Sequence, residues 1–236
     1  AGTTFGSVFK NNKHFDFAVA ISTGRNKFQT NEIFGERNSS TVAIMEMQPK
    51  FNMPFIQLGL MRENDASLGL SGSGALNGSN NQLTSFVGIS DSINLFGGKF
   101  FGSFYLGKSN NIENELGMIK SLSDLYSSSF GIGYLKSSIF NNGDSFIFTI
   151  DQPIRIESGK LHLNVPTFRT KEKNVLFNSI NFNLDPSGRE IHAKGEYFTS
   201  FRDIGLGLTL GYKSDPYHIK FMDDYWYMSL GFNIDI

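Results

Sequence analysis

The last twelve residues of the chain alternate strictly between two kinds of side chain. The even positions from Trp226 to Ile236 are all apolar, whereas the odd positions from Tyr225 to Asp235 are tyrosine, small or polar. A period of two places every second side chain on the same face of a β-strand. Because about ten residues suffice for a tilted strand to cross a bilayer, the segment predicts a two-faced strand of membrane-spanning length.

Other segments repeat this alternation, and turn residues separate them. The clearest repeats are residues 15–21, 146–150, 180–184, 191–197 and 204–210. Asn-Gly and Pro-Ser-Gly sequences at 141–144 and 185–188 are typical of turns between strands. Counting such segments gives about a dozen strands, and since bacterial barrels hold an even number, we expect 12.

The remaining stretches are less regular. We expect longer loops at residues 22–40 and 108–123, and a short helix within 112–125. Residues 64–80 are rich in Gly and Ser, so strand and loop cannot be told apart there. Residues 3–9 already read as a strand.

Composition supports a protein with one apolar and one polar surface. Charged residues make up 18% of the chain, below the roughly 25% that is usual in soluble domains, while aromatic residues reach 14%. No run of about 18 apolar residues exists, which excludes a transmembrane helix in this sequence. We therefore predict an all-β fold: one transmembrane antiparallel β-barrel of about 12 strands over residues 1–236. A soluble barrel or sandwich is the alternative, although its strands would usually be shorter.

Several function classes find no support. The net charge of −1 offers no basic field for nucleic acid. The chain has no cysteine, its four histidines are not at metal-ligand spacing, and no phosphate-binding glycine loop occurs. We expect no cofactor, no metal and no enzymatic activity, although a Ser/His/Asp site assembled across strands remains an alternative.

One segment combines alternation with charge. Glu190, His192, Lys194 and Glu196 share the polar face of a predicted strand, and we expect them to line the barrel lumen. They would either form a hydrated wall of mutual ion pairs or contact a plug at a constriction. We favour the wall, because a narrow barrel must neutralise its own interior. Partners from a neighbouring strand could be Asp151, Arg155 and Glu157.

The extreme C-terminus carries a second pattern. Ser229, Gly231, Ile234 and Ile236 fit polar-x-Gly-x-x-apolar-x-apolar. This resembles the signal that the barrel assembly machinery reads in bacterial outer-membrane proteins. An alternating terminal strand can pair by β-augmentation, and glycine permits close backbone approach. Ile236 departs from the pattern, since Phe or Trp is commoner there.

Two further stretches carry a family resemblance. Gln152, Pro153, Arg155, Glu157 and Gly159 belong to the first, and Pro186, Ser187, Gly188 and Arg189 belong to the second. With these stretches the chain from about Gly72 onward resembles the C-terminal barrel domain of autotransporters that carry subtilisin-like serine protease passengers.

The resemblance implies a translocator of type V secretion. Such a barrel inserts in the outer membrane of a Gram-negative bacterium and lets an N-terminal passenger reach the cell surface. Its partners would be outer-membrane lipids, the barrel assembly machinery and the passenger or linker segment in the lumen. Any protease activity would lie in the passenger, and the chain is expected to be the C-terminal part of a longer precursor. Alternatives are a small porin-like channel, an anchor of a surface protein, or an outer-membrane hydrolase.

Overall fold

The computed structural model describes residues 2–11, 14–26, 38–50, 53–64, 66–67, 70–71, 82–113, 117–201 and 204–234. It is an all-β protein with antiparallel sheets, which confirms the predicted fold class at that level. No helix in these ranges is both long and apolar enough to cross a membrane.

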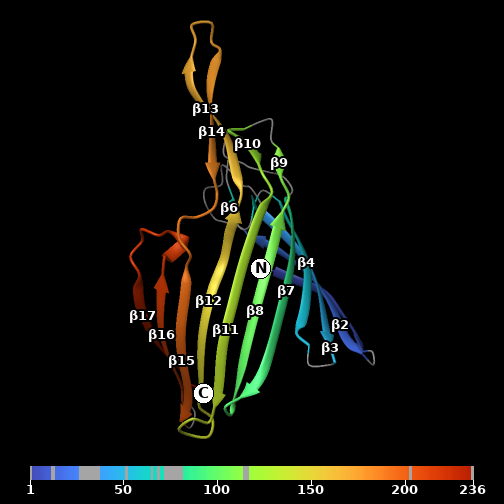
Figure 1. The fold of residues 1–236 in the computed structure, drawn as a ribbon, viewed down its shortest axis with the longest axis vertical. Coiled ribbons are helices and arrows are strands. Elements are labelled where there is room, and N and C mark those ends of the chain that lie inside the picture. The colour runs from blue at the N-terminus through green and yellow to red at the C-terminus, as the bar shows by residue number, and fades with distance from the viewer. Residues whose placement is uncertain are drawn as a thin grey trace. The chain divides into compact units, whose positions relative to one another are not determined.

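Eleven strands form the main sheet, in the hydrogen-bonded order β1-β2-β3-β4-β7-β8-β11-β12-β15-β16-β17 (Figure 1). Their bounds are β1 Gly2–Asn11, β2 Phe15–Asn26, β3 Asn38–Pro49, β4 Phe55–Asn64, β7 Gln82–Leu95, β8 Gly98–Ser109, β11 Leu125–Ser137, β12 Ser145–Ser158, β15 Ile191–Phe201, β16 Ile204–Ser214 and β17 Tyr225–Ile234. Each holds 10 to 14 residues, which is longer than the roughly 5 to 6 residues usual in globular sheets.

Two smaller sheets complete the described part of the chain. A four-stranded sheet has the order β14-β13-β10-β9, and a two-stranded one pairs β5 with β6. Their bounds are β5 Ala66–Ser67, β6 Leu70–Ser71, β9 Ile112–Glu113, β10 Ile119–Leu122, β13 Lys160–Arg169 and β14 Val175–Asn183. A 3-10 turn, η3, covers Pro216–His218.

The predictions differ from this arrangement in four places. One is the loop expected at 108–123, because that range holds the end of β8 together with β9 and β10. The segment 180–184 belongs to β14, and so to the four-stranded sheet, which leaves eleven described strands in the main sheet where 12 were expected. The helix expected within 112–125 is wrong: the described residues there form β9, β10 and the start of β11. The predicted loop at 22–40 is too long, because 22–26 and 38–40 are strand, and its middle lies outside the described residues.

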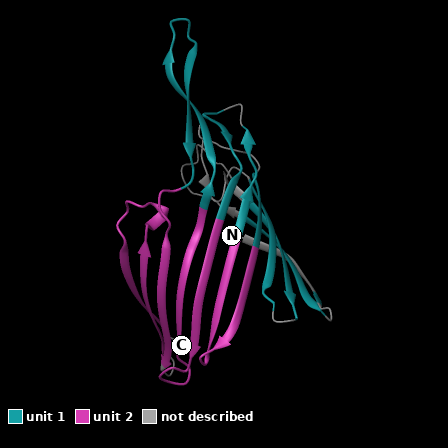
Figure 2. Ribbon diagram, viewed as in Figure 1, with its two compact units in different colours: residues 1–87, 106–127, 156–185 teal, residues 88–105, 128–155, 186–236 magenta. Residues whose placement is uncertain are grey.

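The chain divides into two compact units, coloured in Figure 2. Unit 1 comprises residues 1–87, 106–127 and 156–185, and unit 2 comprises 88–105, 128–155 and 186–236. The single domain over 1–236 stays a prediction. The residues discussed as a candidate site below lie in unit 2.

The pairing of β16 with β17 shows the two faces that the sequence predicted. Leu206 lies opposite Phe232, Leu208 opposite Leu230, and Leu210 opposite Met228. The residues between them pair on the other face, where Thr209 is opposite Ser229 and Gly207 is opposite Gly231. Since directly paired residues share a face, one side of this strand pair is wholly apolar.

The buried residues are mainly polar, whereas in a soluble protein they are mainly apolar. Leu125 is the only large apolar side chain that is buried in the described part of the chain. The buried polar or charged residues are Glu63, Gln82, Thr84, Ser109, Ser127, Asp144, Gln152, Glu190 and His218. On β17 the exposed fractions of Trp226, Met228, Leu230 and Phe232 lie between 69% and 75%. An exposed apolar face of this extent marks a surface that can meet a partner or a lipid environment.

The turn between β11 and β12 is organised by one carboxylate. Asp144, only 2% exposed, accepts hydrogen bonds from the backbone N–H groups of Ile139, Phe140 and Asn141 at 2.6–3.1 Å. It also accepts one from the Tyr197 hydroxyl of β15 at 2.8 Å. Burial alone would raise the pKa of Asp144, but these donors hold it below its usual value. The turn is therefore built around an ionised Asp144.

Asp144→Asn should lower the thermal unfolding midpoint of the folded chain in detergent micelles at neutral pH. The amide offers one acceptor oxygen where the carboxylate offers two. Because the folded-state pKa is lowered, the contribution of Asp144 is complete above its usual pKa of about 3.9 and is lost as the pH falls through the folded value. The difference between the two proteins should thus shrink towards acid pH. Asp223→Asn, at an exposed position, is the matched control; equal effects of the two changes at neutral pH would contradict this role.

Candidate functional site

Polar side chains from three segments of unit 2 converge on one cluster, called here the polar knot. They come from the second half of β12, from residues 186–190 of the β14–β15 connection and from the end of β16 with the β16–β17 connection at 215–224. Figure 1 shows these two connections at the same end of β15, β16 and β17. The knot comprises Gln152, Arg155, Ser187, Gly188, Arg189, Glu190, Lys213, Asp215, Tyr217 and His218.

Arg155 joins the two stretches that carry the family resemblance. Its Nε donates to the carbonyl oxygen of Gly188 at 3.0 Å, and its Nη2 donates to that of Pro186 at 2.8 Å. Gln152 makes a second link, because its side-chain oxygen accepts a hydrogen bond from Arg189 and its amide donates to the Ser128 carbonyl. A guanidinium with several fixed donors suits this role, since it satisfies carbonyls that no strand partner reaches.

Glu190 is the charged centre of the knot. Lys213 lies 3.0 Å from its Oε1, and the backbone N–H of Tyr217 donates to its Oε2 at 2.7 Å. The residue as a whole is 5% exposed. Burial alone would raise the pKa of Glu190, but the bonds from Lys213 and Tyr217, with the nearby His218, hold it below its usual value. The carboxylate therefore stays ionised and ties two connections together.

His218 is fully engaged in structural hydrogen bonds. Its Nδ1 accepts from the backbone N–H of Glu190 at 2.9 Å, and its Nε2 faces the Ile154 carbonyl at 3.1 Å. This pattern requires the tautomer with the proton on Nε2, where it can be donated to the carbonyl. With both ring nitrogens used, His218 has no atom left to bind a metal or to act as a base.

Close packing around Gly188 explains the glycine of the second stretch. A Cβ at this position would lie 2.7 Å from the backbone nitrogen of Lys220 and 2.9 Å from the Asp215 carboxyl group. The Gly188 N–H also donates to the His218 carbonyl at 2.8 Å. Asp215, Tyr217 and His218 have positive φ values, so the connection is held in a conformation that L-residues rarely adopt.

The predicted lumen residues His192, Lys194 and Glu196 share one face of β15, as their spacing required. Lys194 and Glu196 form an ion pair at 2.8 Å, whereas a position of these residues in a barrel lumen stays a prediction. His192 Nδ1 lies 3.8 Å from Asp151 Oδ1, and its Nε2 shares a hydrogen bond with the Tyr227 hydroxyl. Glu190 does not join this row, because it precedes β15 and belongs to the knot.

Tyr227 reaches His192 by passing over a glycine. Gly211 of β16 pairs directly with Tyr227 of β17, and a Cβ at Gly211 would lie 2.3 Å from the tyrosine ring. The rings of Tyr227 and His192 lie 5.5 Å apart. The terminal strand is thus linked to β15 across β16, which requires glycine at position 211.

The structure accounts only in part for two predicted groups, the assembly signal and the first family stretch. Ser229 and Gly231 of the proposed assembly signal lie on the polar face of β17, Ile234 is the last residue of that strand, and Ile236 is outside the described residues. From the first family stretch, Gln152 and Arg155 enter the knot, whereas Glu157 and Gly159 belong to unit 1.

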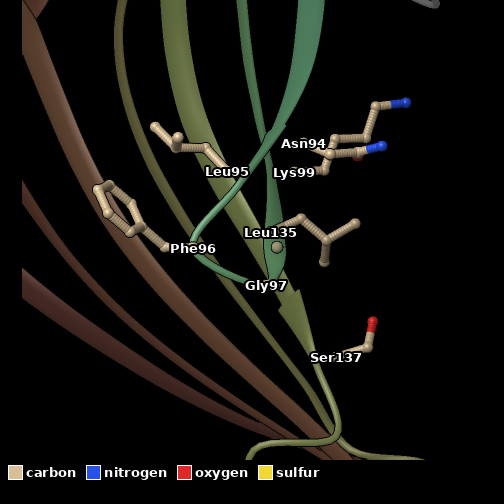
Figure 3. Close-up of a pocket in the computed structure, with 8 residues that line it drawn as sticks. Asn94, Leu95, Phe96, Gly97, Lys99, Leu135 and Ser137 are labelled. Carbon is tan, nitrogen blue, oxygen red and sulfur yellow. The ribbon is translucent and has the colours of Figure 1, made fainter.

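An open hollow lies at the β7–β8 turn of unit 2. Figure 3 shows Asn94 and Lys99 projecting to one side of this turn and Phe96 to the other. Phe96 is 82% exposed, and its backbone carbonyl accepts a hydrogen bond from the Tyr134 hydroxyl. Lys99 is the only ionisable side chain among its lining residues, so the hollow offers no acid–base pair.

Three of the described histidines show no sign of a hydrolytic site. The imidazoles of His162, His192 and His218 have Asn181, Tyr227 and backbone groups as their hydrogen-bond partners, and no serine hydroxyl is among these. Over the same residues no group of three or more acidic or histidine side chains could hold a metal ion.

The sequence singled out six of the ten residues of the knot, as family stretches or as lumen residues, but did not predict that they come together. Lys213 was not among them, and Asp215, Tyr217 and His218 stood out only as a turn and as part of the family resemblance. Tyr227 was assigned to the polar face only by alternation. Comparisons with models of protein families, with curated proteins and with solved structures give no match for this chain.

Proposed function

We propose that this chain spans the outer membrane of a Gram-negative bacterium as a closed β-barrel. The observation that carries this proposal is the exposed apolar face of β16 and β17, whose leucines are 42–71% exposed while buried positions are mainly polar. In water such a face would be unfavourable by roughly 25 cal/mol for each Å² of apolar surface. Lipid removes that cost, and a barrel leaves no unpaired strand edge in the hydrocarbon.

We further propose that the barrel is a type V translocator, which anchors and exports an N-terminal passenger. Support comes from the resemblance and from the contacts of the residues that carry it. Arg155 of the first stretch bonds to Pro186 and Gly188 of the second, which lie 31 and 33 residues further along the chain. Its partners would be outer-membrane lipids and the barrel assembly machinery, which would act on the terminal strand. A passenger or linker beside Lys194 and Glu196 would be the third partner. The chain itself would not be an enzyme.

Fusion of an epitope-tagged passenger to the N-terminus of this chain, behind a secretion signal, tests the proposal in a Gram-negative host. The tag should become accessible to antibody and to added protease on intact cells. A heat-modifiable barrel with the tag retained in the periplasm would reject the translocator but keep the membrane barrel. No heat-modifiable form at all would reject both.

A channel is the second candidate. The charged row with the Lys194–Glu196 pair and Asp151 would suit a hydrated interior. Purified protein in a planar bilayer should then give stable conductance steps whose size changes in Glu196→Gln. Absence of conductance, after proteolytic removal of any plug, would count against a channel.

A further inference from the structure

The β13–β14 hairpin of unit 1 carries an unusual surface at its outer end. Near its base, Leu161 and Leu163 of β13 pair with Leu122 and Ile119 of β10. Further out, β13 pairs with β14 alone among the residues that the structure describes. Figure 1 shows this hairpin extending well beyond β9 and β10, which belong to the same sheet. A two-stranded hairpin in water is marginally stable unless its apolar side chains are covered.

The lower part of the hairpin has one polar face. His162 bonds to Asn181 at 2.6 Å, and Ser179 donates to Asn164 at 2.7 Å. Those pairs lie on the same side, whereas the opposite side is apolar, with Leu163 facing Ile180. This part is an ordinary two-faced ribbon.

The outer end, called here the hairpin tip (residues 166–177), is apolar on both faces. A register shift after Pro166 brings Phe168 opposite Leu176 on one face, while Pro166–Phe177 and Arg169–Val175 occupy the other. The exposed fractions of these residues are 64% for Phe168, 52% for Leu176 and 58% for Phe177. A protein partner would cover one face of such a ribbon, whereas lipid can surround both.

The tip also concentrates positive charge. Arg169, Lys171 and Lys173 are exposed and have no ion-pair partner in the described part of the chain, and Glu172 is the single acid among them. With Lys160, residues 160–183 carry four cations and one anion, hence +3, in a chain whose net charge is −1. The turn is ordered, because Thr170 N donates to the Asn174 carbonyl at 2.8 Å and Lys173 N to that of Thr170 at 3.0 Å.

We propose that the hairpin tip docks on a bilayer that contains anionic phospholipid. Its lysines and arginine contact the head-group phosphates, and Phe168, Leu176 and Phe177 enter the boundary with the acyl chains. Long cationic side chains hold their charge at head-group level while their stems lie along apolar surface, so both groups can be satisfied at one depth. This surface would act whether or not the barrel exports a passenger.

The absence of cysteine permits a site-specific test. The full chain with Asn174→Cys, labelled with an environment-sensitive fluorophore, is held in nanodiscs of zwitterionic phosphatidylcholine and mixed with vesicles. Vesicles of phosphatidylcholine with a quarter phosphatidylglycerol should shift the emission to the blue, and nitroxide-bearing lipid should quench it. Pure phosphatidylcholine vesicles should do neither.

Paired variants distinguish the charge of the hairpin tip from the net charge of the whole chain. Lys171→Gln with Lys173→Gln should weaken binding to the anionic vesicles about thirtyfold, since each cation near such a surface contributes about fivefold. Lys99→Gln with Lys220→Gln removes the same net charge elsewhere, at exposed positions, and should change binding little. Phe168→Ser with Phe177→Ser should abolish the quenching.

Three results would overturn the proposal. The first is an equal response to zwitterionic vesicles, and the second is unchanged binding in the Lys171/Lys173 variant. The third is an emission shift without vesicles that grows with protein concentration, which would assign the tip and the β14 edge to a second copy of the chain. Because the passenger fusion is read on intact cells, failure there and failure here are independent.

Discussion

Leu230→Arg is expected to prevent most molecules of the protein from assembling into a membrane. Leu230 is 71% exposed and lies opposite Leu208 on the apolar face of β16 and β17. If that face meets lipid, an arginine near the bilayer centre costs about 2–4 kcal/mol. The fraction of heat-modifiable protein after refolding into phosphatidylcholine vesicles should fall accordingly, and Phe232→Asp should act in the same direction.

Ser229→Arg is the matched control, because Ser229 is the neighbouring residue on the opposite face of the same strand. An arginine there would enter a polar surrounding that already holds Lys194 and Glu196. It should leave assembly close to that of the unchanged chain. If Ser229→Arg blocks assembly while Leu230→Arg does not, the two faces have been assigned the wrong way round.

Glu190→Ala should give the second large effect, a loss of about 3 kcal/mol in the free energy of unfolding. The change leaves the Lys213 ammonium and the Tyr217 N–H without the carboxylate that now binds both. The Lys213 side chain is 27% exposed, so water can compensate in part and the effect stays at the lower end for a broken buried pair. Urea unfolding of the refolded barrel, followed through the fluorescence of its single tryptophan, measures it.

The pH dependence of that effect has a definite sign. Since the folded-state pKa of Glu190 is lowered, its contribution is complete above the usual glutamate pKa of about 4.3 and is lost as the pH falls through the folded value. Glu190→Gln keeps an acceptor for Tyr217 but loses the charge, so its destabilisation should be intermediate and should fade in acid. Glu113→Ala, at an exposed position, is the control. If it lowers the free energy of unfolding as much as Glu190→Ala does, the contacts of Glu190 in the knot do not account for the effect.

Alternation predicted the fold class because each strand must present one apolar and one polar face. That signal is local, so it placed His192, Lys194 and Glu196 on one side of β15 without any knowledge of their neighbours. It also assigned Ile180 and Phe182 to a strand correctly. Alternation carries no information on strand partners, however, and for that reason it could not show that this strand pairs with β13 in a separate sheet.

The knot could be found only in part, because its bonds join residues far apart in sequence. Glu190 and Lys213 are 23 positions apart by residue number, and His218 reaches Ile154 over a separation of 64. The helix expected within 112–125 failed for another reason. The apolar residues of β10 are held by pairing with β13, a tertiary contact that overrides the local preference of a polar, leucine-containing segment.

Nitroxide scanning along β17 would show whether its apolar face meets lipid. Single cysteines at Met228, Leu230 and Phe232, and at Ser229 and Gly231, would be spin-labelled in this otherwise cysteine-free chain and reconstituted in lipid. If the apolar face of β17 meets lipid, relaxation by oxygen should dominate at the three even positions and relaxation by a water-soluble nickel complex at the two odd ones. Equal accessibility at all five positions, or nickel access at the even ones, would contradict a lipid-facing apolar surface.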